Sequence, residues 1–189
     1  VNKMPGYQID KYANLRVGYT YMFGHCGKKL LFMGQDFAQE REWSEERELD
    51  WYLLDEDLNK GMHEYMKELL ALYNKYPSFY ENDNSWDGFE WLNPDDAENS
   101  VYSFFRKNST GKNNILFVLN MTPMSRENYR VGVPKRGKYK LLLNSDEKRF
   151  GGNGNKIPDT VTAQVKPCDF RNYSICFDLP PYTAAVFLF

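Results

Sequence analysis

The stretch VYSFFRKNSTGKNNILFVL, residues 101–119, shows the pattern on which the fold prediction depends. Two short apolar runs, Val101 to Phe105 and Ile115 to Leu119, flank the polar segment NSTGKNN at 108 to 114. Apolar runs of this length are typical of strands, and a segment rich in Asn, Ser and Gly is typical of a turn. The stretch therefore predicts two strands separated by a turn.

The same succession of apolar runs and turns extends from residue 88 to residue 189. Further turn segments are PKRG at 134 to 137 and GGNGN at 151 to 155, and no helical periodicity lies between the runs. Eight short strands without helices predict an all-β antiparallel sandwich or barrel. The expected strands are Phe89 to Leu92, Val101 to Phe105, Ile115 to Leu119, Tyr129 to Val133, Tyr139 to Leu143, Val161 to Val165, Tyr173 to Phe177 and Ala184 to Phe189.

Residues 1 to 76 show a different pattern, in which helical periodicity surrounds one short apolar run. The run Leu30 to Met33 is too short for a helix and lies between glycines, so it predicts a buried strand. One helix is expected from Asp10 to Phe23, and a second begins after an N-cap at Asn59 and stops before Pro77. Helix, buried strand, long loop and helix is the order found in an α/β barrel or an open α/β sheet.

The first helix has apolar residues at three- and four-residue spacing, which predicts one buried face. The residues of that face are Tyr12, Leu15, Tyr19, Met22 and Phe23. The domain organisation that follows is the end of an α/β domain over 1–76, a linker over 77–87 and an all-β domain over 88–189. We expect the all-β domain to be autonomous, because its runs pair without needing the helices before them.

The composition indicates a globular protein: 42% of the residues are hydrophobic, 26% charged and 16% aromatic. With 24 basic and 26 acidic residues the net charge is only −2, so charge offers no case for nucleic acid or an anionic membrane as partner. No apolar run is long enough to span a bilayer, and we expect a cytosolic protein. The sequence opens at Val1 without an initiator methionine, which predicts a piece of something larger.

An acidic run lies between the strand at 30–33 and the second helix. Its carboxylates could supply the acid and base of a glycosidase, but the interleaved Arg41 and Arg47 favour solvated ion pairing. Trp43 and Trp51 in the same segment fit equally a sugar-stacking platform or a staple that holds the loop to the domain. The acidic residues are Glu40, Glu42, Glu45, Glu46, Glu48 and Asp50.

No metal, cofactor or nucleophile site is predicted from the motifs. HEYMK at 63–67 begins like a zinc-protease helix, but Lys67 stands where the second histidine is required. GGNGNK at 151–156 lacks the spacing of a phosphate loop, so a turn is favoured. Cys26, Cys168 and Cys176 form no CxxC pair and fit buried thiols.

The sequence resembles the C-terminal portion of glycogen branching enzymes, the 1,4-alpha-glucan branching enzymes of the alpha-amylase superfamily (glycoside hydrolase family 13). The resemblance covers essentially all 189 residues in order. The motifs that carry it are NKMPG, KYANLR, GKKLLFMGQDFAQEREW, LDWYLL, GFEWL, DDAENSVYSFFR, NMTP, YRVGVP and LLNSD.

This resemblance implies an enzyme that cuts an α-1,4-glucan and rejoins the piece through an α-1,6 bond. In that family a (β/α)8 barrel carries the catalytic carboxylates, which would all lie upstream of Val1, so no catalytic residue is assigned here. Leu30 to Met33 would be the eighth strand of this TIM-like barrel, within its last helix-strand-helix. The loop Gly34 to Asp57 would then lie on the catalytic face.

The residues expected in the glucan groove are Gln35, Asp36, Trp43 and Trp51. Where many relatives read Gly-Glu-Phe, this chain reads Gln35-Asp36-Phe37, which keeps an acid but shortens its reach by one methylene. The expected partner is an α-glucan such as glycogen or amylose, with self-association of the isolated chain through barrel faces. Two other functions stay open: a non-catalytic carbohydrate-binding or stabilising module, and the tail of another superfamily enzyme, either debranching or maltosyl-transferring.

Overall fold

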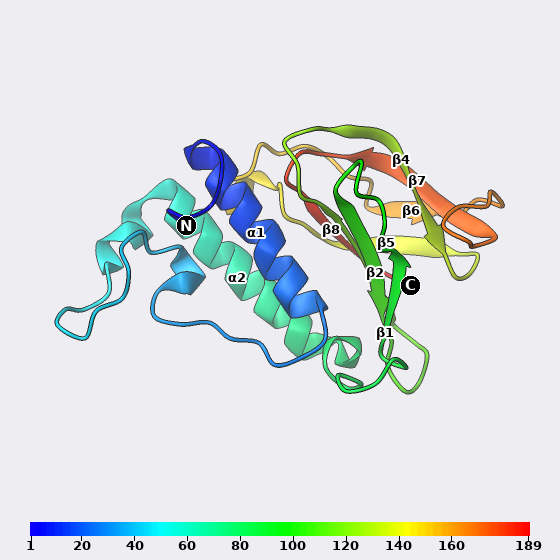
Figure 1. Ribbon diagram of the computed structural model, residues 1–189, viewed down its shortest axis with the longest axis horizontal. Helices are drawn as coiled ribbons and strands as arrows, with labels where there is room; N and C mark the ends of the chain where they lie inside the picture. Colours follow the sequence, from blue (N-terminus) through cyan, green and yellow to red (C-terminus); the bar gives the residue numbers. More distant parts are fainter.

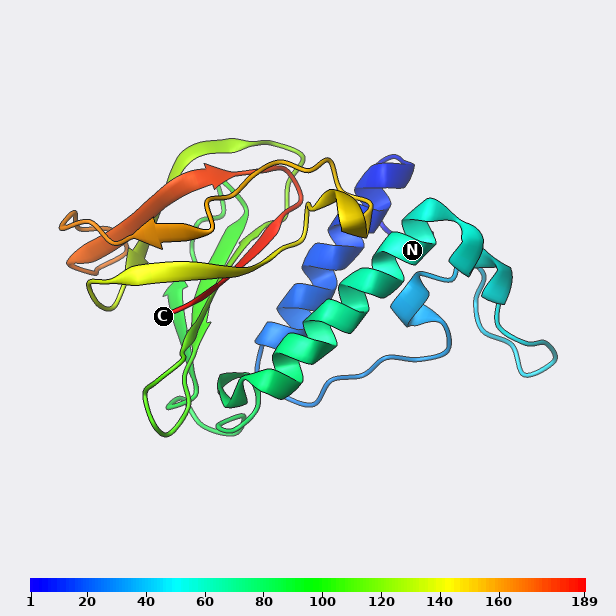
Figure 2. The same cartoon turned by 180° about the vertical axis from the view of Figure 1, so that it is seen from behind.

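The structure is a computed structural model that describes all residues, 1–189, and it has three layers (Figure 1). Two long helices, α1 (Gln8–Gly24) and α2 (Asp57–Lys75), lie side by side and pack on one face of a six-stranded sheet (Figures 1 and 2). A two-stranded sheet covers the opposite face. Neither helix combines the length and apolar character that a bilayer crossing would require.

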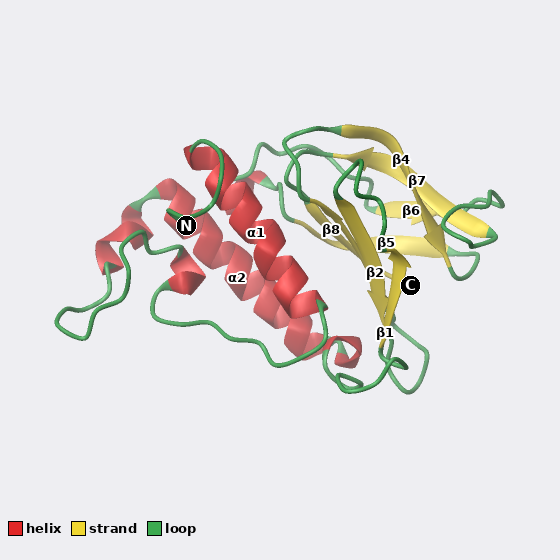
Figure 3. Cartoon of the chain, in the orientation of Figure 1, coloured by secondary structure: helices red, strands yellow, loops and turns green.

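The eight predicted strand segments are confirmed, and the two sheets form an antiparallel sandwich (Figure 3). The larger sheet has the order β1-β2-β3-β8-β5-β6 and the smaller one pairs β4 with β7, all antiparallel. The strands are β1 (Phe89–Asn93), β2 (Val101–Arg106), β3 (Ile115–Asn120), β4 (Arg126–Val133), β5 (Lys138–Asn144), β6 (Thr160–Thr162), β7 (Tyr173–Leu179) and β8 (Ala184–Leu188). Only β6 is much shorter than expected, since the chain leaves the sheet before Val165, which is exposed.

The layers explain why the run Ile115 to Leu119 is apolar at every position. In a strand, alternate side chains point to opposite faces. Phe117 belongs to the core between the sheet and the helices, whereas Leu116 and Val118 belong to the core between the two sheets. Because both faces of β3 are covered from Ile115 to Leu119, no position in this run favours a polar residue.

The buried face of α1 differs from the predicted one. Tyr12 and Phe23 are buried as expected, but Leu15, Tyr19 and Met22 are only half-buried. The helix turns a partly polar stripe to the core instead, which consists of Tyr12, Ala13, Arg16, Val17, Thr20, Phe23 and Gly24. Apolar spacing could not reveal this stripe, because its polar members are satisfied by partners far along the chain.

Arg16 shows how a charged side chain comes to lie in that stripe. Its Nε donates to the Ser145 carbonyl at 2.7 Å and its Nη1 to the Phe150 carbonyl at 2.9 Å, while the side chain is fully buried. Burial lowers the pKa of the guanidinium, and two carbonyl acceptors replace part of the lost hydration. Arg16 therefore ties α1 to the turn after β5.

The predicted strand at Leu30 to Met33 is wrong for this structure. The segment is irregular, Leu30 is 72% exposed, and Phe32 and Met33 are also largely exposed. An isolated strand leaves its N–H and C=O groups unpaired, and none of the eight strands lies beside this segment.

The predicted helix cap at Asn59 is also wrong. The helix α2 begins at Asp57 with Glu56 as N-cap, so Asn59 lies inside the first turn. Asn59 is buried, and its amide is used by groups outside the helix, which removes it from capping. The end of α2 at Lys75, before Pro77, is as predicted.

Candidate functional site

The loop between the helices, residues 34–57, carries all four predicted site residues and lies at the end of the helical pair away from the sheets (Figure 1). It contains two short 3₁₀ helices, η1 (Gln35–Phe37) and η2 (Trp51–Asp55). Gly34 is the N-cap of η1 and has φ of 80°, and a Cβ there would lie 2.9 Å from Cβ of Gln39. Glycine is therefore required at this turn for both backbone angle and space.

A buried hydrogen-bond network anchors η1 to both helices. Asn59 Nδ2 donates to the carbonyls of Phe37 at 2.8 Å and Ala38 at 3.2 Å, and Asn59 Oδ1 accepts from Tyr12 Oη at 2.8 Å. All four residues are nearly inaccessible to solvent. Sequence reasoning missed this network, and its only signal was an asparagine, a poor helix former, in the first turn of a helix.

Gln35 and Asp36 lie on η1 beside both helices. Gln35 Oε1 accepts from the Phe32 backbone N–H at 3.0 Å, and the Gln35 carbonyl accepts from Tyr19 Oη at 2.7 Å. The half-buried Asp36 Oδ2 lies 3.3 Å from His63 Nδ1, without the alignment of a hydrogen bond. Burial, with Asp36 nearby, raises the pKa of Tyr19 to about 12, so its hydroxyl remains a donor at neutral pH.

Ion pairs hold the acidic part of the loop. Arg41 binds Asp50 through two hydrogen bonds, and Asp50 is buried although Arg41 is exposed. The bond to Arg41 keeps the pKa of the Asp50 carboxyl below its usual value. Arg47 donates to the Glu42 carbonyl at 2.6 Å, and Lys3 pairs with the Glu42 side chain. Of the two interleaved arginines, Arg41 therefore forms an ion pair with the acidic run, and Arg47 binds a backbone carbonyl of it.

Each indole of the loop is held on one side and open on the other. Trp43 contacts Phe32 edge-on at 5.3 Å between ring centroids, and 43% of the residue is exposed. Trp51 lies at 5.5 Å from Phe37 with a tilt of 34°, and 54% of it is exposed. Both residues meet the geometric condition of a sugar platform, a supported ring with free area, and both also anchor the loop.

Two of the predicted residues share one depression and two do not. Gln35 and Trp43 line a cavity of about 630 Å³ whose wall also includes Glu40 and Glu42, while Asp36 and Trp51 lie outside it. Half-exposed aromatic, amide and carboxylate groups suit the binding of a neutral polyhydroxyl ligand.

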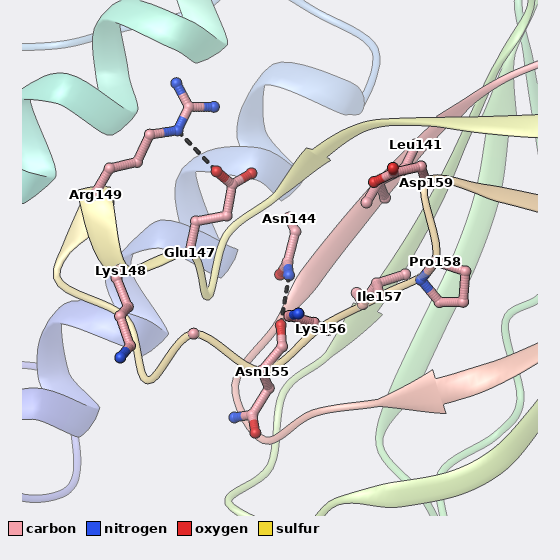
Figure 4. A pocket seen from close by; sticks show the side chains of 11 residues that line it. Leu141, Asn144, Glu147, Lys148, Arg149, Asn155, Lys156, Ile157, Pro158 and Asp159 are labelled. Carbon is pink, nitrogen blue, oxygen red and sulfur yellow. Dashed lines mark hydrogen bonds and ion pairs between the residues drawn. The ribbon is translucent and has the colours of Figure 1, made fainter.

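A larger cavity, about 740 Å³, lies elsewhere, beside the turn after β5 (Figure 4). Its polar groups bind one another: Asn144 Nδ2 donates to the Asn155 carbonyl at 2.8 Å and Arg149 Nε to Glu147 at 2.8 Å. The segment GGNGN folds around the buried Asp146 carboxylate, which accepts from the backbone N–H of Asn153 and of Asn155. The segment is therefore an organised turn. The wall of the cavity beside it contains no aromatic ring.

Comparison with known proteins gives consistent matches. The family model for the alpha amylase C-terminal all-beta domain matches residues 91–189. The chain is 64% identical over its full length to a 1,4-alpha-glucan branching enzyme GlgB of Butyrivibrio fibrisolvens and 44% identical over 99% of its length to one of Halothermothrix orenii. It spans 30% of each of these relatives.

Among solved structures, the chain is similar to a trehalulose synthase MutB, with a TM-score of 0.59 and 9% sequence identity. The match covers 94% of this chain and 38% of the trehalulose synthase chain. At this identity the match shows the fold alone. The family model covers more than half of the chain. The chain therefore belongs to the family of the alpha-amylase C-terminal all-beta domain, in the form that 1,4-alpha-glucan branching enzymes carry.

Proposed function

We propose that this chain serves as the C-terminal part of a 1,4-alpha-glucan branching enzyme, which cleaves an α-1,4-glucan and transfers the piece to form an α-1,6 branch. The observation that carries the proposal is the 64% identity to such an enzyme over the whole chain. An α-glucan is then the partner, and the cytosolic location expected from the sequence is part of the same proposal. The domain division at 1–76, 77–87 and 88–189 also belongs to it.

In this proposal the helical pair is the end of the catalytic barrel. Support comes from an apolar groove of about 480 Å³ between α1 and the segment 30–33, whose wall includes Leu15, Tyr19, Met22, Leu30 and Phe32. A helix packed behind a barrel strand presents such a face to its neighbours. Leu30, Phe32 and Met33 are apolar side chains that are exposed here, and the rest of the barrel would cover them.

The loop 34–57 is proposed to form the rim of the glucan groove, with Gln35, Asp36, Trp43 and Trp51 as its glucan-facing residues. Catalysis would come from carboxylates outside this chain, because retaining transfer needs a nucleophile and an acid about 5 Å apart on one scaffold. The acids of the loop are instead committed to ion pairs or to solvent. Rim residues would orient the glucan and not react with it.

The test compares the full-length protein containing this chain with the isolated 189-residue chain. Each is incubated with amylose, and the iodine colour and α-1,6 linkages are followed. We expect branch points from the full-length protein and none from the isolated chain. Branch points made by the isolated chain, and abolished by replacing Asp36, Glu40 or Glu42, would contradict this placement of the active site.

A second function, a non-catalytic carbohydrate-binding module, is favoured by one observation. A pocket of about 260 Å³ where α1 meets β1 is lined by Trp86 and Trp91 together with the polar Asp83, Asn84 and Ser85. Indoles beside hydroxyl, amide and carboxylate groups suit a sugar ring. Calorimetry with maltoheptaose tests this function by comparing the unmodified isolated chain with its Trp86→Ala variant. We expect the substitution to weaken binding. Binding that the substitution does not weaken would place the sugar elsewhere.

A further inference from the structure

We infer that Asn59 is a positioning residue for the rim loop, acting through Phe37 on the exposed indole of Trp51. The inference rests on the proposed function for its consequence in catalysis, but the contacts on which it depends are independent of that function. They form a chain that runs from α1, across α2, to η1 and then to η2.

The first step is the commitment of the Asn59 amide. Its Nδ2 serves two carbonyls, of Phe37 at 2.8 Å and of Ala38 at 3.2 Å, and its Oδ1 accepts from Tyr12 Oη at 2.8 Å. Two carbonyl acceptors on one side require the NH2 group there, so the amide has a single workable orientation. Burial raises the pKa of Tyr12 to about 12, so its hydroxyl stays protonated at neutral pH. The hydroxyl can therefore donate to Asn59 Oδ1 on the other side of the amide.

The second step is the strain that this amide offsets. Ala38 has φ of 57°, in the left-handed region that favours glycine, and its side chain is nearly inaccessible to solvent. Such a conformation persists only where surrounding contacts hold it. The Asn59 amide binds the carbonyls of Phe37 and Ala38, one before and one after the Ala38 α-carbon, and it thereby holds the end of η1 in its turn.

The third step connects η1 to the surface. Phe37 is fully buried and its ring supports Trp51 at 5.5 Å, so the buried ring forms the base on which the half-exposed indole lies. If the carbonyl of Phe37 loses its donor, this base is free to shift, and the orientation of Trp51 changes without any substitution in the loop.

Asn59→Asp is the sharpest variant, because it keeps the shape but sets an oxygen against the two carbonyl oxygens. Thr20→Val is the matched control: it removes a buried hydrogen bond of the same helix pair, between Thr20 and Tyr65, and the Thr20 hydroxyl binds only Arg16 and Tyr65. Trypsin treatment of the isolated chain reports on the loop directly, through cleavage after Arg41 and Arg47. We expect cleavage there to accelerate about tenfold in Asn59→Asp and to stay unchanged in Thr20→Val.

In the full-length enzyme we expect Asn59→Asp to raise KM for amylose about fivefold with kcat little changed. Trp51→Ala should have a similar effect, and the double variant should be no worse than the stronger single one, because both substitutions act on the same indole. If Asn59→Asp fails to fold, Phe37→Leu takes its place, since it keeps an apolar core residue but removes the supporting ring.

Two results would overturn the inference: unchanged cleavage at Arg41 and Arg47, or additive effects on KM in the double variant. Lack of branching activity in the unmodified full-length protein would instead refute the proposed function. The trypsin comparison would still decide whether Asn59 positions the loop, so the two failures are distinguishable.

Discussion

The two indoles of the rim loop give the most direct test of the glucan groove. Replacing Trp43 or Trp51 by alanine in the full-length enzyme should weaken activity on long glucans by about 1 kcal/mol per ring, or roughly fivefold. The loss should exceed the effect on melting temperature, because each ring keeps about half of its area free. Phe170→Ala, an exposed ring on a distant hairpin, is the control and should leave activity unchanged. Equal losses of activity and melting temperature would instead indicate that the indoles only hold the loop to the domain.

Phe170 itself occupies a strained position. With Asp169 it forms the turn between the paired Cys168 and Arg171, with φ of 49° and 57° at the two turn residues. Asp169 is anchored by the Gly132 N–H at 2.8 Å, whereas Phe170 is fully exposed. Glycine is strongly preferred at the second position of such turns, so Phe170→Gly should raise the free energy of unfolding by about 0.5–1 kcal/mol. Urea unfolding measures this, and an equal gain in Phe170→Ala would show that φ is not the cause.

At the level of whole elements, the six-stranded sheet depends on the helices for one of its two faces. Phe104, Phe117 and Val186 are fully buried against α1 and α2. Residues 88–189 expressed alone would expose this face, while the core between the two sheets stays covered. We therefore expect the excised segment to keep its β circular dichroism but to melt at a lower temperature and bind the dye ANS. A melting temperature equal to that of the whole chain would instead support full autonomy.

For the molecule as a whole, we expect buried and half-buried tyrosines to limit stability at alkaline pH. Burial raises the pKa of Tyr12, Tyr19 and Tyr139 to about 12, from an ordinary value of 10.0. Because the folded-state pKa is raised, the contribution is complete below pH 10 and is lost as the pH rises toward 12. Urea midpoints should fall across that interval, and less steeply in Tyr139→Phe; a flat profile would contradict the burial of these hydroxyls.

Self-association of the isolated chain is a second property of the whole molecule. The groove between α1 and the segment 30–33 exposes Leu30 and Phe32, and a second copy could cover this apolar surface. Light scattering should therefore show dimers or larger species whose mass falls in a Leu30→Glu variant. Lys28→Glu is the control, because it changes the charge of a nearby residue that is already polar and exposed. It should not alter the mass of the species measured by light scattering. A monomer at high concentration would refute the proposal.

The positions of the strands and the end of α2 could be predicted from the sequence, because they depend on residues close together in the chain. Apolar runs of five residues, turns rich in Asn and Gly, and a proline after Lys75 act within a few residues, so eight strand segments and the stop before Pro77 could be predicted. The location of Gln35, Asp36, Trp43 and Trp51 in one loop follows for the same reason.

Other features depend on partners that sequence spacing does not reveal. Arg16 is buried in α1 because carbonyls at Ser145 and Phe150, about 130 positions later, bind it. Asn59 serves η1 instead of capping α2, because Phe37 and Tyr12 lie within reach only after the helices pack. Leu30 to Met33 has strand composition but no strand beside it to pair with. Hydrogen bonding of buried polar groups and pairing of strands are properties of neighbours in space, and packing alone supplies those neighbours.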